Sequence, residues 1–258
     1  MKGGISPMEQ VTVAESRGFW ENVKHNVKAL FTLQYYKDGF SGWTPQSRVW
    51  WVIGLAVLLT TGFAHGFDPM TIISVVGGAI GFTCTLAITN NKKLNGLLGF
   101  VSAFMISYVA FHAGNYADIF MQSGYVIFLD IPVILFGMAW QNKKIKTMDK
   151  QGWLILVVGL LAMFGLLYLI DTHVFVSPRP VIDAFSAAVG FTGAFLMLGK
   201  YSSQYWMWTL QGVMSVTLWG ITAMQGDANW VLFMTYVLYL GNDLLGLFFS
   251  PWSARNIK

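Results

Sequence analysis

A polar and aromatic stretch at residues 200–212 holds the side chains best suited to bind a small organic molecule. It reads KYSSQYWMWTLQG inside an otherwise apolar chain. On a helix, Tyr205, Trp208 and Gly212 share one face, and Gln211 lies beside them. Aromatic rings stack on planar heterocycles, more strongly on cationic ones, and a buried glutamine needs a hydrogen-bonding partner. The spacing predicts a recognition site, although rings near a helix end also suit an aromatic belt at the membrane surface.

Two further segments extend this set of polar groups. Ser215 and Trp219 continue the same helical stripe, and a second group follows in the last apolar segment. Tyr239, Asn242 and Asp243 fall there on one side of a helix. Asp243 is an ionisable group inside an apolar run, which favours a functional role. The predicted substrate-binding residues are Tyr205, Trp208, Gln211, Ser215, Trp219, Tyr239, Asn242 and, in the first half of the chain, Asn95.

A second group of positions suggests close packing or motion. Gly96 and Gly99 follow Asn95 at a spacing that permits close approach of helices. Pro132 lies beside Asp130 and should break the hydrogen-bond ladder of its helix, which could mark a hinge. The predicted gating or packing residues are Gly96, Gly99, Pro132, Gly212 and Asp243.

Catalytic and metal-binding patterns do not stand out in the sequence. The chain has one cysteine, Cys84, and its four histidines are spread apart, so neither type forms a metal-binding cluster. No glycine-rich loop with a lysine could cradle a nucleotide phosphate. We therefore expect no enzyme activity, no cofactor, no metal site and no nucleic-acid partner.

The composition places the candidate residues in a lipid bilayer. Of 258 residues, 55% are hydrophobic and 11% are charged, whereas soluble domains carry about 25% charged residues. Continuous apolar runs of roughly 20 residues indicate helices rather than a β-barrel. We predict an all-α integral membrane protein with eight transmembrane helices. They lie near 48–65, 70–89, 95–113, 119–140, 152–170, 180–199, 205–225 and 229–250.

The positive charges fix the orientation of these predicted spans. With eight spans, every lysine and arginine except Arg179 falls on the side that holds both termini. Because cytoplasmic loops carry an excess of Lys and Arg, both termini are expected in the cytoplasm. Within the N-terminal segment, residues 17–37 place apolar and basic residues at helical spacing, which predicts an amphipathic helix that either lies on the membrane surface or caps the bundle.

A short phrase occurs twice and reveals an internal repeat. Residues 79–83 read AIGFT and residues 188–192 read AVGFT, 109 residues apart. Two apolar segments follow each copy, so the repeat unit is three helices. The copies start four spans apart and therefore cross the membrane in the same direction, as in a parallel repeat. We expect the substrate between the two units, with most recognition groups supplied by the second.

This order divides the chain into one extra helix and a 3+1+3 arrangement. The predicted parts are a cytoplasmic segment with the amphipathic helix at 1–47, a peripheral helix at 48–66, the first three-helix repeat at 70–141, a linker helix at 152–170, the second repeat at 180–250 and a cytoplasmic tail at 251–258.

Taken together, these features resemble the PnuC family of bacterial nicotinamide riboside transporters. The resemblance covers about residues 70–250 and includes the Lys200-Tyr201 pair, Trp208 and the Gln211-Gly212 pair. Family members often carry Trp at the position of Tyr205 and Asn at the positions of Gly212 and Gly99, so this chain departs from the pattern there. The family looks like a fused relative of the SWEET and SemiSWEET fold.

The resemblance implies a function that the residues alone do not choose. It implies uptake of nicotinamide riboside across the bacterial inner membrane by facilitated diffusion. A cytoplasmic nicotinamide riboside kinase would then trap the substrate, and the transporter would be a homotrimer. Related proteins carry thiamine, riboflavin or deoxynucleosides, and a membrane scaffold without transport is the remaining alternative.

Overall fold

The computed structural model describes residues 18–64, 66–114, 116–174, 180–224, 230–253 and 256–257. Within these ranges the chain is helical, with no strand and one isolated bridge between Lys146 and Tyr201. The helices are α2 (Phe19–Ala29), α3 (Leu33–Phe40), α4 (Pro45–Ala64), α5 (Pro69–Thr89), α6 (Leu94–His112), α7 (Tyr116–Tyr125), the π-helix η1 (Val126–Asp130), α8 (Ile131–Asn142), α9 (Lys150–His173), α10 (Pro180–Leu198), α11 (Gln204–Met224) and α12 (Trp230–Phe249).

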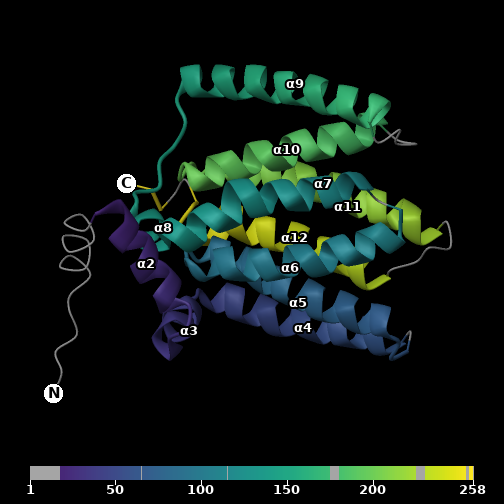
Figure 1. Ribbon diagram of the computed structural model, residues 1–258, viewed down its shortest axis with the longest axis horizontal. Coiled ribbons are helices and arrows are strands. Elements are labelled where there is room, and N and C mark those ends of the chain that lie inside the picture. The colour runs from purple at the N-terminus through teal and green to yellow at the C-terminus, as the bar shows by residue number, and fades with distance from the viewer. Residues whose placement is uncertain are drawn as a thin grey trace.

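The long helices lie side by side, while α2 and α3 cross one end of the bundle near the C-terminus (Figure 1). In the described part of the chain, seven segments are long and apolar enough to cross a membrane. They are α4, α5, α6, the continuous run Asp118–Asn142, α9, α10 and α12. The helix α11 has 21 residues, as many as α5, but is not among the seven. The sequence prediction of an all-helical membrane protein is confirmed.

Six of the described helices form a closed ring. Going round it, α5 packs on α6, α6 on α7, α7 on α10, α10 on α11, α11 on α12, and α12 returns to α5. The helix α4 lies outside against α5 and α12, and α9 lies outside against α10 (Figure 1). Each of these outer helices thus precedes, and packs on, the first helix of a predicted repeat.

The doubled phrase lies at the two places where the halves of the ring meet. A side chain at Gly81 on α5 would overlap the hydroxyl of Tyr239 on α12. A side chain at Gly190 on α10 would likewise overlap the hydroxyl of Tyr125 on α7. Each glycine therefore makes room for a tyrosine from the other half of the chain, which gives the doubled phrase a packing role.

A wide turn interrupts the run from α7 to α8. Pro132 has no N–H to donate, and its ring crowds the carbonyl of Phe128 four residues earlier. The helix widens here, and the N–H of Ile131 bonds to the carbonyl of Val126, five residues back. The backbone of Phe136 is also non-helical, with φ −123° and ψ 19°. The break that Pro132 predicts is therefore a π-helix followed by a kink.

The N-terminal amphipathic segment is two helices rather than one. It breaks after α2 because Thr32 caps α3, its hydroxyl accepting the N–H of Tyr35. The helix α2 packs on α8, where the Asn26 amide donates to the carbonyl of Leu135 at 2.7 Å. Phe19 also contacts Phe136, with ring centroids 5.5 Å apart. The helix α2 is thus fastened to the kinked part of α8.

Candidate functional site

A pocket lies inside the six-helix ring. Its walls come from α5, α6, α7 and η1 in the first half and from α11 and α12 in the second. The atom-free space, including the part open to solvent, is about 860 Å³. The ring therefore holds a hollow that side chains from both halves of the chain line.

Aromatic rings from both halves line the pocket. Trp208 and Tyr125 meet edge to face, with centroids 5.9 Å apart, and Tyr236 and Tyr239 meet at 5.5 Å. Trp208 is fixed by a hydrogen bond from its indole N–H to Gln204 at 3.1 Å. Such rings can hold a planar heterocycle by stacking.

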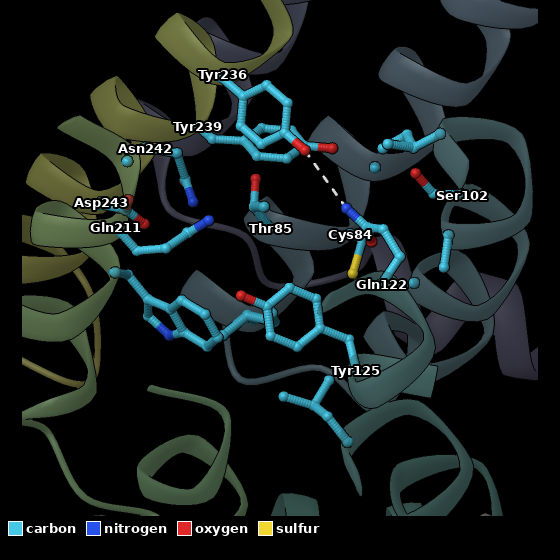
Figure 2. A pocket seen from close by; sticks show the side chains of 18 of the residues that line it. Cys84, Thr85, Ser102, Gln122, Tyr125, Gln211, Tyr236, Tyr239, Asn242 and Asp243 are labelled. Carbon is cyan, nitrogen blue, oxygen red and sulfur yellow. Dashed lines mark hydrogen bonds between the residues drawn. The ribbon is translucent and has the colours of Figure 1, made fainter. Parts of the chain in front are cut away.

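Amide side chains converge on the same space. Figure 2 shows Gln211 and Asn242 approaching from one side and Gln122 and Tyr125 from the other. The Gln122 amide donates to the Tyr236 hydroxyl at 3.4 Å. The Asn242 oxygen accepts from the Thr89 hydroxyl at 3.1 Å, and no described residue accepts a hydrogen bond from its N–H₂ group. These amides could pair with a ligand carboxamide or hydroxyl.

Most, but not all, of the predicted residues line this pocket. Those that do are Tyr205, Trp208, Gln211, Tyr239 and Asn242 from the binding set, and Gly99, Gly212 and Asp243 from the gating or packing set.

Five predicted residues lie behind the pocket wall and support it. Ser215 accepts a hydrogen bond from Gln211 at 2.9 Å, and the Trp219 ring stacks on Tyr236 with centroids 6.1 Å apart. Asn95 is fully buried, its amide donating to the carbonyl of Lys92. The two others are Gly96, which closely approaches Asp130 and Val133, and Pro132, which follows the π-helix.

The sequence reasoning missed the contribution of the run from α7 to η1. Gln122, Tyr125 and Asp130 all line the pocket, and they belong to the first half of the chain. The expectation that the second half supplies most recognition groups stays a prediction, to which the structure adds these three side chains of the first half. The missed signal was a set of polar side chains at helical spacing, Asp118, Gln122 and Tyr125, inside an apolar run. Asp118 itself is buried and accepts from Tyr236 at 3.2 Å.

The acidic and basic side chains are unequally represented in the described lining of the pocket. Asp130 and Asp243 line it, whereas no described Lys, Arg or His does. Phosphate-binding sites rely on Arg, Lys or helix N-termini. The walls therefore suit a neutral or cationic ligand better than a phosphorylated one. Among the described residues, no group of three or more His, Cys, Asp or Glu side chains could hold a metal ion.

The end of the bundle that holds α2 and α3 contains a buried lysine. Lys200, between α10 and α11, has its amine 3.8 Å from the ring centroid of Trp140 and 4.8 Å from that of Trp252. It also donates to the Asn91 side chain. Burial and the nearby Lys143 lower the pKa of Lys200 to about 7. This residue ties together loops from both halves of the ring.

The match to a family agrees with this architecture. A family model described as nicotinamide mononucleotide transporter matches residues 71–254. The chain belongs to this family. The matched range contains the six elements of the ring, apart from the first two residues of α5, and the whole pocket, but it leaves out α2, α3 and α4.

Two known members of this group resemble the chain along most of its length. One is named nicotinamide riboside transporter PnuC, from Haemophilus influenzae, with 22% identity over 217 residues, which are 81% of this chain and 90% of the relative. The other is a crystal structure of the vitamin B3 transporter PnuC, with a TM-score of 0.72 and 23% identity. It covers 83% of this chain and 94% of that chain. The transporter fold predicted from the sequence is thus confirmed.

Proposed function

We propose that the protein transports nicotinamide riboside across the membrane by facilitated diffusion. The observation that carries this proposal is the pocket inside the ring, which combines aromatic rings, amides and two carboxyls without a described basic side chain. Nicotinamide riboside offers a cationic ring to the aromatic groups, and a carboxamide and hydroxyls to the amides. Its phosphorylated form, the mononucleotide of the family's description, would bring a phosphate without a cationic partner in these walls.

The proposed topology has eight crossings, and α11, predicted from the sequence near 205–225, is the one that the seven apolar segments leave out. Its polar residues Gln204, Gln211 and Ser215 are buried, whereas Trp206 and Val213 on its other side are exposed. The indole N–H of Trp252 donates to the carbonyl of Ile88 at 2.8 Å, so the tail after α12 lies beside the α5–α6 loop. An even number of crossings explains that neighbourhood, and both termini are then cytoplasmic.

The repeat is a parallel 3+1+3 arrangement in this proposal. The ring order and the matched pairs Gly81–Tyr239 and Gly190–Tyr125 support it. The resemblance of residues 70–250 to PnuC transporters supports three further parts: location in the bacterial inner membrane, assembly as a homotrimer, and trapping of the substrate by a cytoplasmic kinase.

Calorimetric titration of the purified protein in detergent tests the substrate. We expect saturable binding of nicotinamide riboside and no comparable binding of nicotinamide mononucleotide, thiamine or riboflavin. Trp208→Ala removes a stacking ring and Gln211→Ala removes an amide, so each should weaken binding about 10-fold or more.

A matched control lies on the same helix. Trp206 is 58% exposed on the outer side of α11, so Trp206→Ala should leave the affinity unchanged. Unchanged affinity in both pocket variants would place the site elsewhere. Tight binding of thiamine or riboflavin instead would mean that this vitamin, and not nicotinamide riboside, is the substrate. Absence of any saturable binding would favour the alternative that the protein is a membrane scaffold without transport.

A further inference from the structure

Two aspartates occupy equivalent positions in the two halves of the pocket. Tyr239 and Asp243 lie four residues apart on the regular helix α12, and therefore share a face. Tyr125 and Asp130 lie five residues apart, but the π-helix η1 lies between them. Because a π-turn bonds residues five apart, it returns Asp130 to the face of Tyr125. Both tyrosines and both aspartates line the pocket.

Glycines on neighbouring helices mirror this arrangement. The carboxyl of Asp130 lies over Gly99 on α6, where a Cβ atom would overlap it. The carboxyl of Asp243 lies over Gly212 on α11, 3.5 Å from the position of a Cβ atom. Each aspartate thus faces a glycine of its own half, as each tyrosine faces a glycine of the other half. The pairing indicates one recognition element that is present twice.

Neither carboxyl has a partner within the described part of the chain. Asp130 is 2% exposed and Asp243 is 7% exposed, so both are shielded from bulk water. No described side chain or backbone group donates a hydrogen bond to either carboxyl, although buried polar groups are normally paired. Both carboxyls border the pocket rather than sealed protein interior. A ligand is therefore the available partner.

We propose that Asp130 and Asp243 are a pair of specificity-determining residues that select ligands with a positive charge. An unpaired carboxylate in a membrane interior is costly, and a cationic ring entering the pocket reduces that cost. A neutral ligand of the same shape does not reduce this cost, and an anionic ligand is repelled by the carboxylates. This inference rests on the proposed function and adds to it the residues that read the charge.

The test compares two forms of one ligand. Nicotinamide riboside carries a cationic pyridinium, and its reduced dihydropyridine form has nearly the same shape without the charge. We expect the wild-type protein to bind the cation more tightly. In Asp130→Asn and in Asp243→Asn, the affinity for the cation should fall about 10-fold or more while that for the neutral form stays within about twofold.

Three controls make the outcome decisive. Asp38→Asn changes an exposed aspartate of α3 and should affect neither ligand. Asp130→Glu and Asp243→Glu keep the charge and should retain part of the preference for the cation. Size-exclusion chromatography and a thermal melt check folding, and the asparagine variant that folds carries the test.

Equal losses for both ligands would mean that the aspartates shape the pocket without reading charge, and the proposal would be wrong. No loss for either ligand would also overturn it. Failure of the proposed function has a different signature, because the wild-type protein would then bind neither form.

Discussion

Lys200 shows how a single residue can join the two halves of the molecule. Its backbone adopts the left-handed conformation, φ 65°, and its side chain is fully buried between Trp140 and Trp252. The sequence identified Lys200 only as one of many positive charges on the cytoplasmic side. Its partners come from α8 and the C-terminal tail, far away in the chain, so spacing could not have predicted them.

The charge of Lys200 should make stability depend on pH. Its pKa is about 7 in the folded protein, whereas an unfolded lysine stays protonated to about pH 10. Above pH 7 the unfolded state therefore binds more protons, and stability rises with pH, by up to about 2 kcal/mol between about pH 7 and pH 8.5. Melts followed by tryptophan fluorescence should show this rise in the wild type and lose it in Lys200→Met. Exposed Lys144→Met is the control; an identical rise in both variants would contradict the assignment.

At the scale of elements, the doubled phrase and Pro132 were visible in the sequence, but their partners were not. The phrase predicted two equivalent helices, now α5 and α10. Only the packing of the ring shows that Gly81 faces Tyr239 and Gly190 faces Tyr125. Likewise, Pro132 predicted a broken helix, whereas the extra residue of the π-helix, which brings Asp130 to the pocket, depends on tertiary packing. The spacing of a regular α-helix therefore could not predict that Asp130 lines the pocket.

Alanine at the two repeat glycines should disturb the joints of the ring. In Gly81→Ala the new methyl group overlaps the Tyr239 hydroxyl, and in Gly190→Ala it overlaps that of Tyr125. Overpacking of this kind costs about 1–3 kcal/mol. We expect lower melting temperatures and weaker nicotinamide riboside binding in both variants. Gly159 on α9 has no atom within 4 Å of a Cβ position, so Gly159→Ala should be neutral or slightly stabilising. Equal effects at all three positions would refute the packing role.

At the scale of the whole molecule, composition predicted the membrane and the helical class, because lipid-facing surfaces must be apolar. The signal is weakest for α11, which the sequence predicts as a span near 205–225, because that helix supplies pocket residues and its polar side chains face inward. A helix that lines a pocket can be too polar to count as a span by composition alone. The contribution of the run from α7 to η1 was missed for a related reason. A few polar side chains in an apolar run do not show by themselves that they face a pocket, because this depends on how the six helices pack into the ring.

Cysteine labelling in intact cells tests whether α11 crosses the membrane. Cys84 is buried and is the sole cysteine of the chain, so Cys84→Ser gives a background for single cysteines. The helix α3 and the C-terminus lie at one end of the bundle, and α6 ends at the other (Figure 1). Ser41 directly follows α3, Asn256 is near the C-terminus, and His112 is the last residue of α6. With eight crossings, an impermeant maleimide added outside should label His112→Cys, and should reach Ser41→Cys and Asn256→Cys only after the cells are permeabilised. If α11 does not cross, Ser41 and Asn256 lie on opposite sides of the membrane, and one of them is labelled from outside. Because the Trp252 indole is bonded beside the α5–α6 loop, that result would contradict the packing of the tail as well as the topology.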